Sequence, residues 1–440
     1  MAEHVIKKDQ TATVKIEESN SEWVLAKNVI LSGSPAFGND TYDNVTLSIS
    51  GETVTSGNGI YFGSAVPGAS TDGATVTLAQ SGRINAEFFG IFISGDDATI
   101  QNNGQIKAQT AEAIYLDGDN VSVVNNGLLR AADAPAIGLT GTEVFSIRNT
   151  GRIVAGADDF AISGQDVAEG RIVNLKSGVI DGAISFDDFN AVDGSVEIIN
   201  KGKIAEGAGA NNTGVSFEGG NDRLINRGLI GGDVNFGNGD DYGDFRRGDL
   251  GGAYILGGDG DDVFVISDTA TKIFEFGNGG SDTIKTTVSY ALGNLAWDDI
   301  EILQAIGKKN INLAGNDDGN VLKGNAGNNA MSGGAGNDIL AGFGGKDTLS
   351  GDMGSDHFYF YKKGGVDTIT DFALDEDVIH IVQVPGIDDF DDLQSRMSSV
   401  DFDGDNDFDT VIDLGGGSRI KLTDIAKDDL EMSDFSIFPE

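Results

Sequence analysis

Residues 332–358, SGGAGNDILAGFGGKDTLSGDMGSDHF, decide the fold expected for the C-terminal part of the chain, because aspartate returns at every ninth position. These aspartates are Asp338, Asp347 and Asp356, and an apolar residue stands two positions after each of them. Glycines gather before each aspartate, where they permit positive φ and let successive carbonyl groups turn toward one point. The spacing therefore predicts a solenoid in which two nine-residue repeats form one coil and each short strand buries one apolar side chain.

The quoted stretch belongs to a longer array of nonapeptides that carry Asn or Asp at the sixth position. Five copies follow one another in register and begin at Gly315, Gly324, Gly333, Gly342 and Gly351. Two isolated copies precede them at residues 257–265 and 277–285, and an echo follows at residues 365–372. Copies in register favour a repeating structure over isolated turns that Gly and Asp merely mark.

Stacked coils about 4.8 Å apart would place these glycine-rich loops directly over one another. Loop carbonyls and aspartates then form clusters of hard oxygen ligands, which suit Ca²⁺ better than Zn²⁺ or the smaller Mg²⁺. We therefore predict several bound Ca²⁺ ions. The residues predicted to bind them are Gly257, Gly258, Gly260, Asp262, Gly277, Asp282, Asn320, Asn329, Gly333, Gly334, Gly336, Asp338, Gly342, Gly344, Asp347, Gly351, Asp356 and Asp367.

These residues match the G-G-x-G-x-D-x-U-x nonapeptide of the repeats-in-toxin (RTX) family, in which U is apolar. Residues 333–340 and 257–264 match it at every fixed position. The resemblance runs from about residue 251 to the C-terminus, because residues 287–313 resemble the strand insert often found between such arrays. It implies a parallel β-roll that binds Ca²⁺. Asn320 and Asn329 depart from the pattern, which implies weaker binding in the first coil.

A second repeat, with a longer period, precedes the nonapeptides. A Gly-x-aliphatic signature recurs at Gly82, Gly104, Gly127, Gly151, Gly178, Gly202 and Gly228. A mean period of about 24 positions with short apolar runs predicts a parallel β-helix with three strands per coil.

An asparagine stands two residues before the glycine in five of these seven coils. Asn174 restores the pattern in a further coil if two extra residues form a loop insertion before Gly178. We expect these asparagines to stack as an internal ladder that satisfies backbone groups at the corner. A ligand role for them is the less favoured alternative.

Together the two repeats predict an all-β chain: a right-handed parallel β-helix continuing into a calcium-binding parallel β-roll, with small terminal caps. The expected ranges are 1–49 for an N-terminal cap that lacks both periods, 50–249 for the β-helix, 250–365 for the roll with its strand insert, and 366–440 for the C-terminal cap and secretion region. Within the last range, residues 401–409, DFDGDNDFD, are similar to an EF-hand loop. Asn406 and Ile412 stand where that loop needs Gly and Glu, so an acidic hairpin turn is favoured.

The composition limits the classes of partner. Seventy acidic residues against 29 basic ones give a net charge of -41, so a compact fold needs cations to offset self-repulsion. Nucleic acid is excluded as a partner, because binding to phosphate needs a basic footprint. The chain has no cysteine, which excludes disulfides, thiolate zinc sites and cysteine nucleophiles.

The chain is expected to be extracellular or on the cell surface. Its N-terminus lacks the apolar core of a signal peptide, so we expect export without an N-terminal signal peptide. No apolar run is long enough to span a bilayer, so we expect a protein that is not inserted in a membrane. The tail, GSRIKLTDIAKDDLEMSDFSIF, resembles the C-terminal region of RTX proteins that bacterial type I systems export, which implies the type I export machinery as a partner. Folding would then await the calcium outside the cell.

The favoured function is that of a secreted calcium-binding structural or adhesive protein of the bacterial cell surface or matrix, and self-association stays open. The alternative is a polysaccharide-active β-helix enzyme, a lyase or epimerase. Such an enzyme needs acid and base groups around a substrate groove. The three histidines, His4, His357 and His380, lie outside the expected β-helix, so the enzyme is the less favoured hypothesis.

Basic residues recur near the Asn-Gly corner of the expected β-helix. Stacked coils would bring them near one another, and a row of cations could dock an anionic extracellular polysaccharide. The alternative is a solvated edge whose charges keep solenoids from pairing. The residues are Arg83, Lys107, Arg130, Arg152, Lys176, Lys203 and Arg227.

Overall fold

The computed structural model describes residues 3–33, 37–39, 43–63, 72–156, 159–187, 194–206, 212–217, 219–275, 280–293, 299–404 and 407–439. The chain divides into two compact units. Unit 1 comprises residues 1–259 and 271–273, and unit 2 comprises residues 260–270 and 274–440. Nearly all regular structure is β-strand, which confirms the predicted all-β class. The sequence predicts the end of the β-helix at residue 249, and the structure divides the chain after residue 259.

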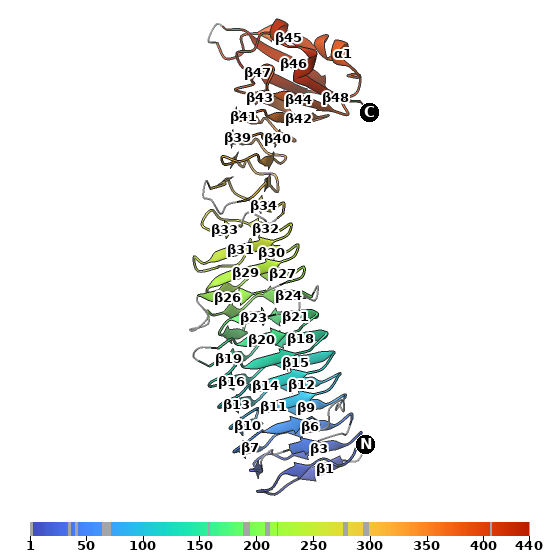
Figure 1. Ribbon diagram of the computed structural model, residues 1–440, viewed down its shortest axis with the longest axis vertical. Helices are drawn as coiled ribbons and strands as arrows, with labels where there is room; N and C mark the ends of the chain where they lie inside the picture. Colours follow the sequence, from blue (N-terminus) through green and yellow to red (C-terminus); the bar gives the residue numbers. More distant parts are fainter. Residues whose placement is uncertain are drawn as a thin grey trace. The chain divides into compact units, whose positions relative to one another are not determined.

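Unit 1 is built from three sheets of parallel strands, and a complete coil contributes one strand to each sheet (Figure 1). Among the residues that the structure describes, the first and the last coil have no strand in the second sheet. The first sheet contains β1 (Glu3–Ile6), β3 (Glu22–Leu25), β6 (Thr46–Ile49), β9 (Thr75–Leu78), β12 (Thr99–Asn102), β15 (Val121–Asn125), β18 (Val144–Asn149), β21 (Glu169–Asn174), β24 (Ser195–Asn200), β27 (Arg223–Asn226) and β30 (Tyr242–Asp244). The second contains β4 (Ile30–Leu31), β7 (Glu52–Thr55), β10 (Arg83–Ala86), β13 (Gln105–Ala108), β16 (Leu128–Ala131), β19 (Arg152–Val154), β22 (Val179–Asp181), β25 (Lys203–Ile204) and β28 (Leu229–Ile230). The third contains β2 (Val14–Lys15), β5 (Phe37–Asn39), β8 (Ile60–Phe62), β11 (Ile91–Ser94), β14 (Ile114–Asp117), β17 (Ile137–Thr140), β20 (Ile162–Gln165), β23 (Ile184–Asp187), β26 (Thr213–Ser216), β29 (Asp233–Asn238) and β31 (Tyr254–Asp259). A short strand, β33 (Lys272–Phe274), crosses the division between the units.

The aliphatic residues of the longer repeat form the core of unit 1. The position two residues after each repeat glycine points inward in the second sheet, and all seven side chains there are fully buried: Ile84, Ile106, Leu129, Ile153, Ile180, Ile204 and Ile230. In a strand, alternate residues face opposite sides of the sheet, so the residues on either side of each aliphatic face outward. The three-stranded coil predicted from the period is confirmed.

An internal asparagine ladder closes one corner of unit 1. From Asn102 to Asn226, each Nδ2 donates to the Oδ1 of the next asparagine at 2.8 to 2.9 Å. Each Nδ2 in these coils also donates to a backbone carbonyl at the corner, and every side chain is fully buried. Asn174 takes its place between Asn149 and Asn200. The ladder and the loop insertion after Asn174 are both as predicted.

Residues 1–49 differ from the expected cap, because their described part already forms coils. Strands β1, β3 and β6 pair in parallel with one another and with β9, and β2 and β5 lead into β8 in the same way. Glu3, Glu22, Thr46 and Thr75 are aligned, although the interval between neighbours widens at each step along the chain. This irregular spacing hides the repeat in the sequence, although the strands stack as they do further along.

Unit 2 has two strands per coil, in two parallel sheets (Figure 1). The first roll sheet contains β32 (Val263–Ile266), β34 (Thr283–Thr286), β36 (Ile302–Ala305), β38 (Val321–Lys323), β40 (Ile339–Ala341), β42 (His357–Tyr361), β44 (Val378–Val382) and β48 (Phe435–Phe438). The second roll sheet contains β35 (Tyr290–Ala291), β37 (Leu313–Ala314), β39 (Ala330–Ala335), β41 (Thr348–Met353), β43 (Val366–Ile369), β47 (Ser418–Leu422), β46 (Asp409–Gly415) and β45 (Met397–Val400).

The register of the roll confirms that two nonapeptides make one coil. Leu322 aligns with Leu340 and Leu340 with Phe358, and each partner lies two nonapeptides further along the chain. In the other sheet Met331 aligns with Leu349 at the same step. Residues 287–313, expected as an insert, supply β35, β36 and the start of β37, which stack as further strands of the coils.

The C-terminal end of unit 2 replaces parallel pairing with antiparallel pairing. Strands β45, β46 and β47 form an antiparallel group, and the helices are short: α1 (Phe390–Gln394), η1 (Lys427–Asp429) and η2 (Met432–Asp434). Residues 401–404 and 407–408 lie between the antiparallel strands β45 and β46, which agrees with the predicted hairpin; Asp405 and Asn406 lie outside the described residues. No helix in the described ranges is long and apolar enough to cross a membrane.

Candidate metal centre

The sixth-position side chains of the nonapeptides form two columns in unit 2. Each of these residues stands at the end of a glycine-rich loop, two residues before the buried apolar residue of a strand. The column beside the first roll sheet contains Asp262, Asp282, Asn320, Asp338 and Asp356. The column beside the second roll sheet contains Asn329, Asp347 and Asp367. All eight side chains are buried, as a ligand cluster between stacked loops requires.

Each aspartate is fixed by the loop of the preceding coil through one carboxylate oxygen. Asp356 Oδ1 accepts a hydrogen bond from the backbone N–H of Asp338 at 2.8 Å, and Asp338 Oδ1 accepts from the N–H of Asn320 at 2.6 Å. In the other column Asp367 Oδ1 accepts from the N–H of Asp347 at 3.0 Å. Hydrogen bonds between successive coils therefore orient the carboxylates of each column.

The second carboxylate oxygen has no hydrogen-bond partner at the three sixth-position aspartates of the five-copy array. Among the described residues, the buried Oδ2 atoms of Asp338, Asp347 and Asp356 receive no hydrogen bond. A buried carboxylate oxygen without a donor carries an electrostatic cost that a bound cation removes. Because these orphaned atoms are oxygen and hard, they fit Ca²⁺.

The first glycine of each repeat leaves room for this oxygen. A Cβ added at Gly333 would collide with Asp338 Oδ2, and the same holds for Gly342 with Asp347 and for Gly351 with Asp356. The added Cβ at Gly333 would also lie 2.6 Å from the carbonyl oxygen of Gly351 in the next coil. Carboxylate and carbonyl oxygens thus converge on the space in front of the first glycine, which is where they would hold Ca²⁺.

Positive φ angles shape the loops that present these oxygens. The second and fourth glycines of the complete repeats have φ between 98° and 120°: Gly258, Gly260, Gly334 and Gly336. In the repeat that begins at Gly342, positive φ falls on Phe343 and Gly345, while the metal-binding role expected for Gly344 stays a prediction. Gly345 occupies the fourth position of that repeat, so position in the repeat was the signal for it. Gly277 lies outside the described residues.

Burial makes the aspartates hold their protons more tightly than usual. It raises the pKa of Asp338 to about 7, with smaller contributions from the charges of Asp356 and Asp352. Burial likewise raises the pKa of Asp347 to about 6 and that of Asp367 to about 7. Ionised carboxylates are therefore disfavoured in these columns unless a cation neutralises them.

The side-chain amides at the two asparagine positions of the columns make all their hydrogen bonds within the protein, without a cation. Asn320 Oδ1 accepts from the backbone N–H of Asn316 at 2.8 Å, and its Nδ2 donates to the carbonyl of Ile300 at 3.0 Å. Asn329 makes the equivalent bonds with Asn325 and Ile311. Since the amide uses both of its polar atoms, these positions offer a cation less than aspartate does, as the resemblance implied.

Comparison with models of protein families matches residues 314–342 and 323–358 to the family described as RTX calcium-binding nonapeptide repeat (4 copies). The chain carries RTX calcium-binding repeats. Calcium is therefore the metal of these loops, and RTX repeats indicate a secreted protein. A comparison with curated proteins gave no match.

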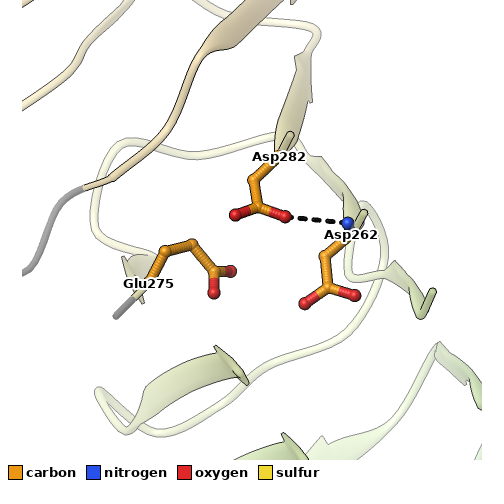
Figure 2. A group of neighbouring side chains, drawn as sticks. All are labelled: Asp262, Glu275 and Asp282. Carbon is orange, nitrogen blue, oxygen red and sulfur yellow. Dashed lines mark hydrogen bonds between the residues drawn. The ribbon is translucent and has the colours of Figure 1, made fainter. Parts of the chain in front are cut away.

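A third carboxylate joins the two sixth-position aspartates nearest the start of unit 2. Asp262, Asp282 and Glu275 are buried, and one oxygen from each lies within 4.8 Å of the others. Figure 2 shows the Glu275 carboxylate turned toward the two aspartates, whose hydrogen bond from Asp262 N–H to Asp282 Oδ1 measures 2.8 Å. Burial raises the pKa of Asp282 to about 7. The three side chains provide oxygen ligands for a divalent cation.

Sequence reasoning missed two members of the first column. Asp377 Oδ1 accepts from the N–H of Asp356 at 2.8 Å, and Glu301 Oε2 accepts from the N–H of Asp282 at 2.6 Å. Neither lies in a glycine-rich repeat. Each nevertheless stands two residues before a buried apolar residue, Ile379 or Leu303, and this D-x-U or E-x-U pattern was the signal available.

The predicted basic residues of unit 1 lie in two neighbouring columns and in turns. Arg83 and Arg152 share one column of the second sheet, while Lys107 and Arg130 share the next. Lys203 belongs with Arg83 and Arg152, and Lys176 and Arg227 lie in corner turns. A polysaccharide-binding role for these seven residues remains a prediction.

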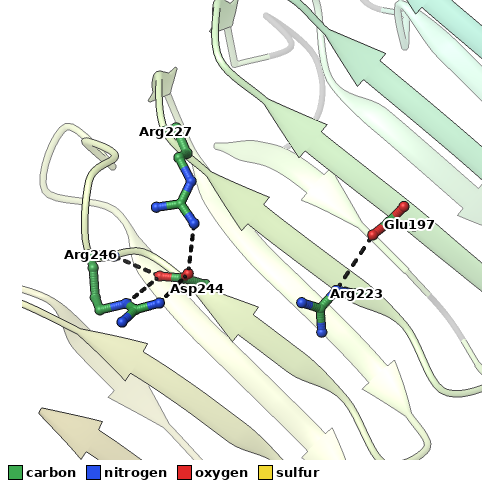
Figure 3. A network of polar contacts seen from close by, with 5 residues as sticks. All are labelled: Glu197, Arg223, Arg227, Asp244 and Arg246. Carbon is green, nitrogen blue, oxygen red and sulfur yellow. Dashed lines mark hydrogen bonds and ion pairs between the residues drawn. The ribbon is translucent and has the colours of Figure 1, made fainter. Parts of the chain in front are cut away.

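Two of these cations already have acidic partners. Arg152 pairs with Asp181 at 2.9 Å, and Arg227 pairs with Asp244 at 3.1 Å. Arg246 contacts the same Asp244 carboxylate, and Arg223 contacts Glu197 nearby (Figure 3). Burial tends to raise the pKa of Asp244, but its hydrogen bonds with Arg246 and the charge of Arg227 lower it overall. These pairs reduce the charge that the corner offers to a polyanion.

The histidines lie in strands of both units. His4 is in β1 of unit 1 and stacks on Trp23, so it belongs to a coil instead of lying outside the β-helix. In unit 2, His357 Nδ1 and His380 Nε2 are 2.8 Å apart, and Tyr359 stacks on His380. Burial, with the charge of His357, lowers the pKa of His380 to about 4. His380 is therefore neutral at physiological pH.

Proposed function

We propose that this chain is a secreted calcium-binding structural or adhesive protein of the bacterial cell surface or extracellular matrix, and that unit 2 folds when it meets calcium outside the cell. The observation that carries the proposal is the set of buried carboxylate oxygens without a donor at Asp338, Asp347 and Asp356. Without a cation, ionising these groups at neutral pH opposes folding. With Ca²⁺, the same groups hold adjacent coils together.

The architecture of unit 1 supports a structural or adhesive role. Its coils repeat the same three faces, so a ligand with repeating units can contact equivalent positions on successive coils. Repeated weak contacts of this kind give strong attachment through multivalency. The acidic surface also suits calcium-bridged contacts with other acidic polymers, because a net charge of -41 repels them in the absence of cations.

The test is a calcium titration of the full-length protein followed by circular dichroism. In excess chelator we expect part of the β-sheet signal to be missing, and we expect millimolar Ca²⁺ to restore it where equal Mg²⁺ does not. A spectrum that is the same in chelator and in calcium would refute the calcium-dependent fold. Calorimetry on the same samples counts the ions bound.

The surface role needs a second experiment in the producing cells. We expect the protein in the extracellular or surface fraction, and we expect cells that lack it to attach or to build matrix less well. Retention inside the cell, or unaltered attachment and matrix, would argue against this role while leaving calcium binding intact. Cleavage of a polysaccharide by the purified protein would support the lyase or epimerase alternative.

A further inference from the structure

An aromatic column runs along the outer face of the third sheet in unit 1. Tyr61 of β8, Phe92 of β11 and Tyr115 of β14 are aligned in successive coils. The ring centroids of Tyr61 and Phe92 are 4.8 Å apart with planes 11° from parallel. Those of Phe92 and Tyr115 are 5.3 Å apart with planes 8° from parallel. We call these three residues, together with Phe89, the aromatic column.

The rings face away from the core, and each of them is partly exposed. Phe89 adds a tilted ring 5.3 Å from Phe92 and 5.4 Å from Tyr115, and the neighbouring Phe88 is 50% exposed. The three aligned rings are of intermediate burial. Parallel rings at these centroid distances favour an offset arrangement, in which part of each face stays open. A strip of partly exposed aromatic rings on the outer side of a sheet can serve as an interaction site.

A column of polar side chains lies directly beside the rings. Ser94, Asp117 and Thr140 are aligned in successive strands, each two residues after the ring position of its strand. Ser94 Oγ donates to Asp117 Oδ2 at 3.3 Å. At the end of the column Gly138 takes the ring position, and a Cβ there would lie 3.2 Å from both Glu112 Oε1 and Tyr115 Cδ2. Hydroxyl and carboxylate oxygens therefore border the open ring faces.

We propose that the aromatic column is a binding face for an uncharged extracellular polysaccharide. A sugar ring has a face of C–H groups that packs on an aromatic ring, and an edge of hydroxyl groups that bonds to oxygen acceptors such as Asp117 and Glu112. Successive coils about 4.8 Å apart repeat this pair of contacts along the sheet. The inference rests on the proposed adhesive function, for which it names one partner and one site.

The charge of the chain favours an uncharged polysaccharide over the other partners that could cover an apolar strip. The chain carries 70 acidic and 29 basic residues, so a second copy, an anionic lipid surface or an anionic polysaccharide meets net repulsion. The carboxylate of Asp117 beside the rings adds to that repulsion. An uncharged polymer with many hydroxyl groups meets none, and it satisfies both the aromatic and the polar column.

The experiment is affinity electrophoresis of the full-length, calcium-loaded protein in native gels. The gels contain hydroxyethyl cellulose, xyloglucan, galactomannan or dextran, with chondroitin sulfate as the anionic comparison. The variant F92A/Y115A removes two rings, and Y61F/Y115F keeps all rings while removing two hydroxyls. F408A is the matched control, because Phe408 is an aromatic residue of unit 2 that is 66% exposed.

We expect at least one uncharged polysaccharide to retard the wild-type protein, and we expect F92A/Y115A to weaken this binding about tenfold or more. Y61F/Y115F and F408A should bind within about twofold of wild type. The inference is overturned if no uncharged polysaccharide retards the wild type, if chondroitin sulfate retards it equally, or if F92A/Y115A binds normally.

Circular dichroism in calcium separates the failure of this inference from the failure of the proposed function. If F92A/Y115A loses its fold, the single variant F89A, which removes the tilted ring at the edge of the column, takes its place with an expected loss of about threefold. A calcium-dependent fold that binds no uncharged polysaccharide overturns only the aromatic column. Loss of the calcium response itself overturns the proposed function.

Discussion

The asparagine ladder predicts a large difference between two asparagine substitutions at one corner of unit 1. Asn149 is fully buried and makes three hydrogen bonds: it accepts from Asn125 at 2.8 Å, donates to Asn174 at 2.9 Å, and donates to the carbonyl of Val179 at 3.4 Å. In N149A, one N–H of Asn125, the Oδ1 of Asn174 and the carbonyl of Val179 lose this partner. A buried group left unsatisfied costs about 1–3 kcal/mol, so the two fully buried side-chain groups alone predict a loss of about 2–6 kcal/mol.

The control is N126A, one coil away from Asn149. Asn126 is exposed; it donates to Asn103 Oδ1 at 2.8 Å, a bond of the same type and length, and its Oδ1 accepts from Thr150 Oγ1 at 2.6 Å. Water replaces both partners, so the expected change is within about 0.5 kcal/mol. Urea unfolding at saturating calcium, read by amide hydrogen exchange of strands β15 to β21, measures the free energy of opening this region. Equal losses for the two variants would show that the buried ladder adds nothing beyond an exposed hydrogen bond.

Three further predictions concern calcium, pH and charge. D338A should raise the calcium midpoint of folding in a titration more than D352A does, because Asp352 is an exposed residue off the sixth position; equal shifts would indicate general charge. In chelator, the protonated forms of Asp338 and Asp347 stabilise the fold, and this stabilisation is fully present below the pKa of the unfolded chain, near 3.8. It should be lost as the pH rises through the folded-state pKa of Asp347, about 6, and that of Asp338, about 7. Circular dichroism should therefore show more β-sheet at pH ~4 than at pH ~8. A spectrum independent of pH would contradict this. Reversing Arg83 and Lys107 to Glu should weaken attachment to an anionic exopolysaccharide at fixed calcium if the basic columns bind it, and unaltered attachment of the folded variant would reject that role.

Most of the fold could be predicted because solenoids turn sequence periods directly into coils. The constant step from Leu322 to Leu340 to Phe358 and the asparagine ladder both follow from spacing alone. The coils within residues 1–49 could not be found in this way, since the widening intervals between the aligned residues conceal a repeat that the strand pairing reveals. Strands can stay paired in register when the loops between them differ in length, but a repeat can be recognised in the sequence only when the spacing is nearly constant.

The candidate sites show the same limit at the level of single residues. The aspartates of the complete repeats could be predicted, because the glycines around them fix the loop. Glu275 could not, because it reaches Asp262 and Asp282 from a segment outside the repeat pattern, and Asp377 shares with the repeats only its position two residues before a buried apolar residue. The aromatic column was invisible as well: Tyr61, Phe92 and Tyr115 are unequally spaced along the chain, and only the register aligns them.

The hydrogen bonds of the first aspartate column all run in one direction, from the N–H of one coil to the carboxylate of the next. The N–H of Asn320 needs the carboxylate of Asp338, that of Asp338 needs Asp356, and that of Asp356 needs Asp377. The series ends at Asp377, whose other oxygen accepts from the nearby N–H of Ala373. Every coil is therefore tied to the one that follows it in the chain, while the last carboxylate is held locally. Removing residues after Phe372 should leave the N–H of Asp356 without its acceptor and weaken the adjoining coil, whereas removing the first nonapeptide should leave the acceptors of the later N–H groups in place.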